Sequence, residues 1–303
     1  MSSSAAVKQA KVPGRRFPEW ATGVLFVSPW IIGFLLFMAL PIGLSFYYSL
    51  SDYTVLEPPI FVGTANYERL ASDPVFWKVM RNTILYAAIS IPVGTILALV
   101  IAALLNTNVK GLTFFRAAVF LPTLVPLVAA AMVWMWLFNG ELGLINTALG
   151  FIGITGPNWL GDAAWVMPAL IIMSLWSVGQ AVVIYLAALQ DVPTSLYEAA
   201  DLDGMGVVRK FLNVTVPMIS PVILFNVIMA IIAAWQVFAV PYIMLGDGVE
   251  RAGYFYTMYL YDQAFRFLNM GAASAMAWVQ LVIILALTGL TFIISKRAVH
   301  YRA

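Results

Sequence analysis

Residues 117–140 read AAVFLPTLVPLVAAAMVWMWLFNG, and no charged side chain occurs between Arg116 and Glu141. A helix needs about 20 residues to cross a hydrocarbon core of about 30 Å, so this stretch is long enough to span a membrane. It is the shortest of six charge-free stretches of at least 24 residues, which lie between Glu19 and Asp52, Arg81 and Lys110, Arg116 and Glu141, Asp162 and Asp191, Lys210 and Asp247, and Arg266 and Lys296. The spacing of the charges therefore predicts six membrane-spanning helices.

The composition supports a membrane protein. Only 10% of the 303 residues are charged and 62% are hydrophobic, whereas an ordinary soluble domain is about 25% charged. There are too few polar residues to cover the surface of a soluble enzyme or a nucleic-acid binder, and the chain is too hydrophobic to be disordered. The chain has no Cys and one His, His300, which excludes thiol chemistry and a His-based metal site or general base within the membrane. We expect neither a catalytic nor a metal site.

We expect an all-α domain, because none of the charge-free windows has the strict alternation of a β-barrel strand. One six-span domain at 22–295 would lie between an N-terminal tail at 1–21 and a C-terminal tail at 296–303. The first span is about twice as long as the 7–15-residue core of a signal peptide, so we expect it to be retained. The expected spans cover about 22–48, 82–106, 117–139, 164–189, 217–241 and 272–295.

A further charge-free stretch, 142–161, reads LGLINTALGFIGITGPNWLG. It is rich in Gly and Asn, contains Pro157, and is separated from the next span by Asp162 alone, which leaves no room for a turn. We interpret it as a loop with one short helix; the alternative is a seventh span.

The positive charges predict the orientation. The two tails and the second and fourth loops carry 11 Lys and Arg, namely Lys8, Lys11, Arg15, Arg16, Lys110, Arg116, Arg209, Lys210, Lys296, Arg297 and Arg302. The first and fifth loops carry 5, namely Arg69, Lys78, Arg81, Arg251 and Arg266, and the third carries none. Both termini are therefore expected in the cytoplasm.

The spans contain no Asp, Glu, Lys, Arg or His, whereas carriers coupled to protons or ions usually keep such a side chain at depth. If these spans form a pathway for a solute, the energy for transport would have to come from outside the membrane, or the transport would be passive. The polar side chains at depth are neutral, and aromatic rings accompany them, which suits an uncharged polyhydroxy solute. For Trp176 and Trp235 a role in the pathway and a role in the interfacial aromatic belt are both open. The neutral polar residues are Ser174, Ser177, Gln180, Asn226, Gln236 and Gln280.

The fourth loop, 189–216, reads LQDVPTSLYEAADLDGMGVVRKFLNVTV and is followed by Pro217. The pattern predicts a short helix that Thr194 or Ser195 caps and that Gly204 and Gly206 end. Such a helix is either a docking element or an amphipathic linker on the membrane surface.

This loop resembles the EAA loop of the permease subunits of bacterial ABC importers. The resemblance lies in Glu198-Ala199-Ala200, then Gly204, and then Val214-x-Val216-Pro217. The two valines stand where the family prefers Ile and Leu. Leu196-Tyr197 and Asp203-Gly204 are similar to carbohydrate-uptake permeases of the maltose-F, lactose-F and glycerol-phosphate-A type, and the six-span layout fits them over essentially the whole chain.

The resemblance implies that loop 190–216 of a type I importer permease carries a coupling helix, which seats in a groove of a cytoplasmic ATPase. Its contact residues would be Glu198, Ala199, Ala200, Asp203, Gly204 and Pro217. The chain lacks the G-x-x-x-x-G-K-[ST] phosphate loop, so it would hold no cofactor, and separate ATPase subunits would bind ATP and Mg²⁺. The implied assembly has a second homologous permease, two ATPases and an extracytoplasmic solute-binding protein, in the cytoplasmic or inner membrane of a bacterium or archaeon, in contact with lipid and without nucleic acid.

The resemblance to the maltose-type permease also implies where a sugar is contacted. The matching positions before the EAA loop are Met173, Trp176, Ser177 and Gln180, and those after it are Ile232, Ala233 and Gln236. With Trp235, the expected pathway residues are Trp176, Ser177, Gln180, Trp235 and Gln236. Two alternatives are an importer for another solute, such as glycerol 3-phosphate or a polyamine, and a passive channel or secondary carrier.

Overall fold

The computed structural model describes residues 18–107, 110–246 and 248–296. Most of the predicted tails, 1–17 and 297–303, lie outside the described residues. The N-terminal half contains α1 (Glu19–Phe34), a π-helical turn (Leu35–Ala39), α2 (Leu40–Ser49), the antiparallel pair β1 (Ser51–Asp52) and β2 (Ile60–Phe61), α3 (Ala65–Ser72), α4 (Pro74–Leu105), α5 (Leu112–Phe120), a 3₁₀ turn (Leu121–Leu124), α6 (Leu127–Leu137) and α7 (Leu144–Phe151).

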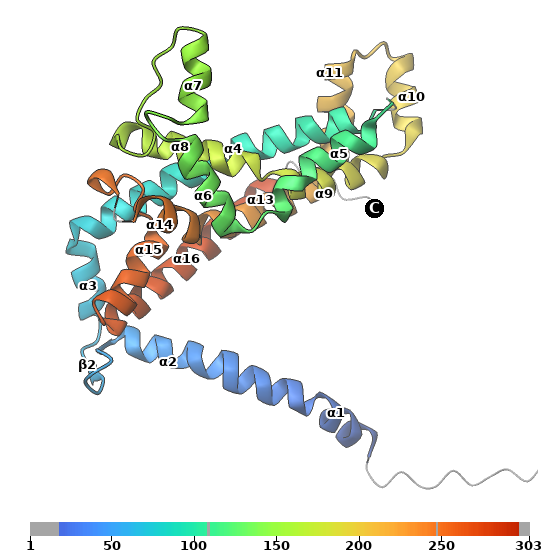
Figure 1. Cartoon of the computed structure of the whole chain (residues 1–303). Coiled ribbons are helices and arrows are strands. Elements are labelled where there is room, and N and C mark those ends of the chain that lie inside the picture. The colour runs from blue at the N-terminus through green and yellow to red at the C-terminus, as the bar shows by residue number, and fades with distance from the viewer. Residues whose placement is uncertain (1–17, 108–109, 247, 297–303) are drawn as a thin grey trace, which may run out of the picture.

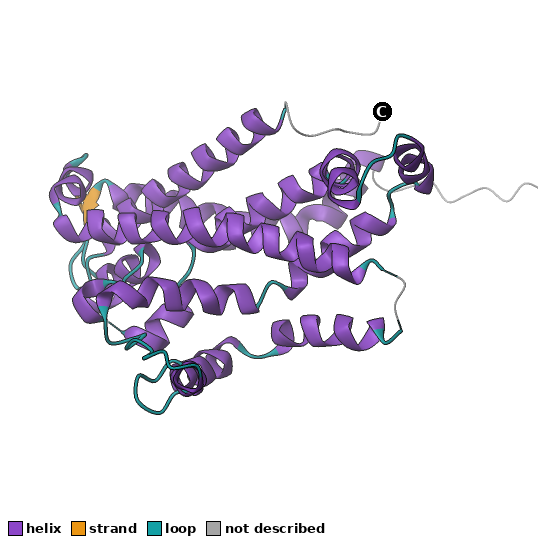
Figure 2. Ribbon diagram, turned by 90° about the horizontal axis from the view of Figure 1, so that it is seen from above, coloured by secondary structure: helices purple, strands orange, loops and turns teal. Residues whose placement is uncertain are grey.

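The C-terminal half is also helical. It contains α8 (Ala163–Trp176), α9 (Gly179–Gln190), α10 (Thr194–Leu202), α11 (Val207–Lys210), a π-helical turn (Phe211–Thr215), α12 (Val216–Met218), α13 (Ser220–Trp235), α14 (Ala239–Leu245), a 3₁₀ turn (Val249–Arg251), α15 (Tyr256–Tyr261), a π-helical turn (Asp262–Arg266) and α16 (Met270–Ser295). Figure 2 shows the helices in purple and the short β pair at one end of the molecule.

Four helical segments are long and apolar enough to cross a membrane, at Trp20–Ser49, Pro74–Leu105, Ser220–Leu245 and Met270–Ser295. Two further segments are bent pairs, in which α5 with its 3₁₀ turn meets α6 at 100° and α8 meets α9 at 45°. The expected spans at 117–139 and 164–189 fall in these two bent pairs, and the sharper bend lies between Leu124 and Leu127, next to Pro122 and Pro126.

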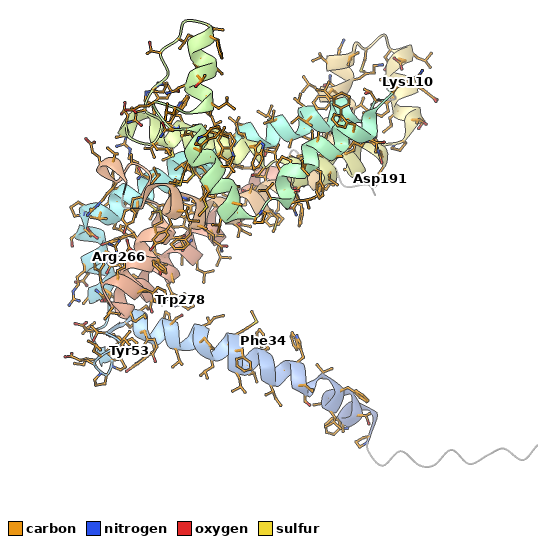
Figure 3. The ribbon with its side chains drawn as sticks, viewed as in Figure 1. Phe34, Tyr53, Lys110, Asp191, Arg266 and Trp278 are labelled. Atoms are coloured by element: carbon orange, nitrogen blue, oxygen red, sulfur yellow. The ribbon has the colours of Figure 1, made fainter. Side chains whose placement is uncertain are left out.

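The two ends of the molecule differ (Figure 1). The β pair, α3 and α15 lie at one end, and α10 and α11 lie at the other. Figure 3 shows Tyr53 and Arg266 at the first end and Lys110 and Asp191 at the second. Helix α1 begins on the same side of the view as α10 and α11.

Helix α4 is the central support. Its first part packs in a core with α6, α8, α15 and α16, and its second part packs in a separate core with α9. Ala98 and Ala102, in the second part of α4, have 0% exposure. Small side chains at these positions let α4 and α9 approach closely, which is how helices associate in lipid without a hydrophobic driving force.

Helices α1 and α2 extend away from this body (Figure 1). Their junction with it is at α16, where the Trp278 indole donates a hydrogen bond to the Ser45 hydroxyl at 3.2 Å and meets the Phe46 ring edge-on at 5.1 Å. Along α1 the large apolar side chains are mostly exposed. This segment therefore has apolar surface left for lipid or a further helix.

Stretch 142–161 is a loop with one short helix, as expected. Helix α7 has eight residues, which is too short to cross a membrane. Asn146 ties the loop together, since its amide donates to the carbonyls of Gly140 at 2.8 Å and Pro157 at 2.9 Å and accepts from the Trp159 indole at 2.7 Å.

The end that carries the β pair is closed by polar contacts between distant segments. The Asn66 amide donates to the carbonyls of Ser49 and Ser51 at 3.0 and 2.8 Å. The Asn82 amide donates to the carbonyls of Arg251 and Tyr254, both at 2.9 Å. Pairing buried carbonyls in this way keeps irregular chain stable beside an apolar core.

We predict that Gly271→Ala lowers the free energy of unfolding by about 1–3 kcal/mol, because an added methyl group forces the backbone to shift. A Cβ at Gly271 would lie 2.3 Å from the Ser51 carbonyl oxygen. Gly289→Ala is the matched control on the same helix, since a Cβ there has nothing within 4 Å. Denaturant unfolding of both variants in detergent measures the difference, and equal stabilities would contradict the close contact.

Alkaline pH should weaken the tie between α15 and the start of α4, where the Tyr259 hydroxyl donates to the Asp73 carboxylate. Burial, followed by the hydrogen bond and charge of Asp73, raises the pKa of Tyr259 from 10.0 to about 12. The folded chain thus holds this proton more tightly than the unfolded chain, and the stabilisation is complete below pH 10 and lost as the pH rises towards 12.

Thermal unfolding across this pH range measures the loss. Tyr259→Phe, which has no proton to lose, should show a smaller decrease in melting temperature than the wild type. Asp73→Asn keeps the burial but removes the charge and should fall between them. The same slope in all three proteins would contradict the assignment.

Candidate functional site

A cavity of about 640 Å³ lies where three helices are interrupted. The first interruption, 121–126, separates α5 from α6; the second, 177–178, separates α8 from α9; and the third, 236–238, separates α13 from α14. Residues from all three interruptions line this cavity, which we call the central cavity.

The interruptions have a shared physical consequence. Backbone that leaves the helix has N–H and C=O groups without an intrahelical partner, and inside a bilayer such groups are tolerated only where protein or a water-filled cavity satisfies them. At the third interruption the Trp235 carbonyl accepts hydrogen bonds from Gln280 at 2.6 Å and from the Thr257 hydroxyl at 3.0 Å. Interrupted helices around a cavity at depth are the way in which many transporters build a solute site.

The structure brings together most of the predicted pathway positions. Trp176, Ser177 and Gln236 line the central cavity, as do Met173 and Ala233. Other segments also contribute lining residues that the sequence did not predict, because a hydroxyl or an aromatic ring in an apolar span gives no signal about the direction in which it faces. The missed lining residues with polar or aromatic side chains are Tyr86, Thr123, Phe238 and Phe255.

Two predicted residues lie elsewhere. Trp235 has 2% exposure, packs edge-on against Tyr256 at 6.1 Å, and lines a separate apolar groove between α4, α13 and α16. Gln180 is exposed in the first turn of α9 and does not line the central cavity. Of the described residues that line the cavity, none is charged.

The fourth loop forms a compact helix–turn–helix unit. Helix α10 begins at Thr194 after Pro193, and neither predicted cap makes a side-chain capping bond. Its end has the expected glycine, since Gly204 has φ +70°. The Gly204 and Met205 amides donate to the carbonyls of Asp201 and Ala200, both at 3.0 Å, which is the Schellman pattern that a left-handed glycine permits.

Two side-chain contacts hold α10 against the following segment. The Lys210 ammonium pairs with the Asp201 carboxylate, and the hydroxyls of Tyr197 and Thr215 lie 3.0 Å apart. Pro217 lies in α12, directly after the π-helical turn 211–215. The unit is therefore positioned by its own contacts and by the root of α13.

The surface of this unit is open. Glu198, Ala199, Asp203 and Gly204 are exposed, whereas Ala200 has 3% exposure and packs inward. Apolar side chains also face outward at this end, among them Leu202, Val207 and Val208, with exposures of 91%, 81% and 72%. Exposed apolar side chains gathered at one place are typical of a protein-docking surface.

The described residues contain no group of three or more His, Cys, Asp and Glu side chains that could hold a metal ion. The site consists of neutral polar and aromatic side chains in the central cavity and of the exposed unit at 194–216.

Comparison with known proteins identifies the family. Residues 90–300 match the family described as "Binding-protein-dependent transport system inner membrane component". The probable ABC transporter permease protein YesP of Bacillus subtilis is 36% identical, with 93% of this chain and 92% of YesP covered. The lactose transport system permease protein LacF of Rhizobium radiobacter is also 36% identical, with 89% and 92% covered.

Solved structures show the same fold. A bacterial ABC transporter involved in the import of the acidic polysaccharide alginate superimposes with a TM-score of 0.80 at 22% identity, and covers 92% of this chain and 96% of its own. The same kind of transporter in complex with an alginate pentasaccharide-bound periplasmic protein gives a TM-score of 0.79 at 21% identity, with 92% and 95% covered.

The chain therefore belongs to the binding-protein-dependent transport system inner membrane components, and it is a multi-pass permease subunit of an ABC transporter rather than an enzyme.

Proposed function

We propose that this permease is one half of a type I ATP-driven importer, with six spans and both termini in the cytoplasm, and that it conducts a neutral sugar or oligosaccharide. A solute-binding protein delivers the solute to the end with the β pair and α3. Two ATPase subunits, which bind ATP and Mg²⁺, act on the opposite end through the unit at 194–216.

The observation that carries the proposal is the connection between that unit and the central cavity. Helix α9 enters the unit and α13 leaves it. At their other ends, α9 begins at the 177–178 interruption and α13 ends at the 236–238 interruption, and both interruptions line the cavity. A displacement of α10 is thus transmitted along two packed helices to the cavity wall, which is the arrangement that alternating access needs.

The surface of α10 supports ATPase docking. Glu198 offers an exposed carboxylate for a cationic partner, and the small side chains of Ala199 and Gly204 allow close approach. Asp203 and Gly204 shape the turn beside it, and Pro217 starts the root of α13. The ion pair between Lys210 and Asp201 keeps the unit rigid, so that a push on α10 moves α9 and α13 instead of deforming the loop.

The cavity supports a neutral solute. Ser177, Gln236 and Thr123 offer hydrogen bonds without charge, and Trp176 and Phe255 offer flat apolar faces. Sugars present both hydroxyl edges and apolar faces, so they fit such a lining. A glycerol phosphate or a polyamine would favour a side chain of opposite charge, and of the described residues that line the cavity none provides one. The name of the lactose-transport relative agrees with this preference.

A second permease completes the pathway in this proposal. The central cavity is not fully enclosed by the described residues, and α1 and α2 have apolar faces that the described chain leaves uncovered. A homologous subunit and the surrounding lipid would cover these faces.

The coupling role predicts the effect of two substitutions. Glu198→Lys reverses the docking charge, and Gly204→Asp places a side chain at φ +70°. Each should lower ATP-dependent sugar uptake in proteoliposomes at least tenfold, while the subunit still inserts into the membrane. Glu19→Lys makes the same charge change at the first residue of α1, outside both the unit at 194–216 and the end with the β pair, and should retain uptake. Wild-type uptake by both coupling variants would refute the coupling assignment.

The pathway role predicts the effect of filling the central cavity. Ala233→Phe adds a ring at a lining position and should lower uptake at least tenfold, with the amount of co-purified ATPase unchanged. Ala286→Phe adds the same ring on exposed α16 and should retain uptake. If the two variants transport equally well, the solute does not pass through this cavity.

The same purification tests the transporter class. The chain, expressed with its genomic neighbours, should bring down an ATPase and a second permease. A passive channel or secondary carrier would purify without an ATPase and would equilibrate sugar without ATP.

A further inference from the structure

A second cavity, of about 300 Å³, adjoins the central one. The two share Tyr86, Ser174, Ser177 and Ala233 in their walls. We call it the inner cavity, because its remaining walls lie nearer to α10.

Residue positions along the helices establish this direction. On α4, which runs toward α5 and the end with α10, Thr95 follows Tyr86 by nine residues, or about 13 Å of helix. On α13, which starts at the same end, Asn226 precedes Gln236 by ten residues, or about 15 Å. Thr95 and Asn226 line the inner cavity only, and Gln236 lines the central cavity only. A solute that leaves the central cavity toward α10 therefore enters the inner one.

Hydroxyl and amide groups are dense in the inner cavity. Its lining has seven polar or phenolic side chains among 15 residues, and of these described residues none is charged. The seven are Tyr86, Ser90, Thr95, Ser174, Ser177, Tyr185 and Asn226. Such a number of polar side chains at one place within apolar spans is costly unless they have partners.

Many of these side chains donate hydrogen bonds to other groups of the protein. The Ser174 hydroxyl donates to the Ile171 carbonyl at 2.7 Å, the Ser177 hydroxyl to the Ser174 carbonyl at 3.0 Å, and the Asn226 amide to the Val222 carbonyl at 3.0 Å. The Tyr86 hydroxyl lies near Ser174, and the Tyr185 hydroxyl lies near Thr95. A hydroxyl that donates keeps acceptor lone pairs, and the Asn226 carbonyl is an acceptor as well.

The lining is therefore rich in acceptors. An anionic group such as a phosphate or carboxylate would find no cationic side chain among these described residues. A cation would lack a counter-charge. A ligand with several neutral O–H donors is well matched.

We propose that the inner cavity is a second sugar-binding compartment, which holds one unit of a neutral saccharide by accepting hydrogen bonds from its hydroxyl groups. This second proposal rests on the proposed transport function. It assigns a role to Thr95 and Asn226 in passing sugar from the central cavity toward the cytoplasm, and it places Tyr86 and Ser174 at the boundary between the two compartments.

The test uses the whole importer in proteoliposomes with ¹⁴C-labelled lactose, maltose and trehalose. The double variant Thr95→Val with Asn226→Leu removes the acceptors at nearly constant volume. Uptake of the sugars that the wild type transports should fall about tenfold or more, with the amount of co-purified ATPase unchanged. Thr291→Val on α16, whose hydroxyl bonds the Leu287 carbonyl outside both cavities, should retain uptake.

The outcomes separate the two proposals. If the wild type takes up a sugar and the double variant takes it up equally well, the inner compartment is overturned. The sugar-transport proposal is then unaffected. Failure of the wild type to take up any of the three sugars, in the presence of ATP and the binding protein, overturns the sugar-transport proposal and the compartment with it.

A second measurement covers a double variant that fails to insert. Because the chain has no Cys, Thr95→Cys introduces a single thiol that a membrane-impermeant methanethiosulfonate reagent can label. We expect labelling of Thr95→Cys and protection by a transported sugar, whereas Thr291→Cys should stay unlabelled. An unreactive Thr95→Cys, or labelling that no transported sugar slows, overturns the compartment.

Discussion

The structure depends on the cost of an unpaired backbone group in an apolar environment. Each N–H and C=O must find a partner, and within one segment only a helix supplies nearly all of them. The spanning segments are accordingly helical, and the chain leaves the helix at depth in very few places. Those places are not scattered: the interruptions at 121–126, 177–178 and 236–238 line one cavity. Irregular backbone and solute-sized space therefore occur at the same place in this structure.

The same constraint explains how distant ends can act together. Between interruptions the segments are continuous helices. Helix α4 packs along α9 through Ala98 and Ala102, whose small side chains allow the two helices to approach closely. The unit at 194–216 is rigid, with the Tyr197–Thr215 contact and the glycine turn at Gly204. The interruptions have fewer intrahelical hydrogen bonds than the helices on either side, so they are the places where a transporter of this kind would bend as it opens and closes.

Prolines show why the site could be predicted only in part. Pro122 and Pro126 flank the sharpest bend, but Pro92 lies inside an unbroken α4. The interruption at 177–178 contains no Pro. A proline frees one carbonyl and permits a bend, yet packing of the neighbouring helices decides whether the bend forms. The neutral polar residues also have different roles that the sequence does not distinguish. Gln236 lines the cavity, whereas Gln280 donates a hydrogen bond to the backbone carbonyl of Trp235.

The sequence by itself determined that this protein is a helical membrane protein, since its charge-free stretches are long enough to span as helices and lack the alternation of β-barrel strands. It also determined the position and the turn of the exposed fourth loop, because Glu198-Ala199-Ala200 and Gly204 are local signals. Only the tertiary structure decided where the helices break, that Ser177 and Gln236 face the cavity, and that Trp235 and Gln180 do not. A side chain in an apolar helix contributes the same hydropathy whichever way it points, so its direction is set by the packing of segments far apart in the chain.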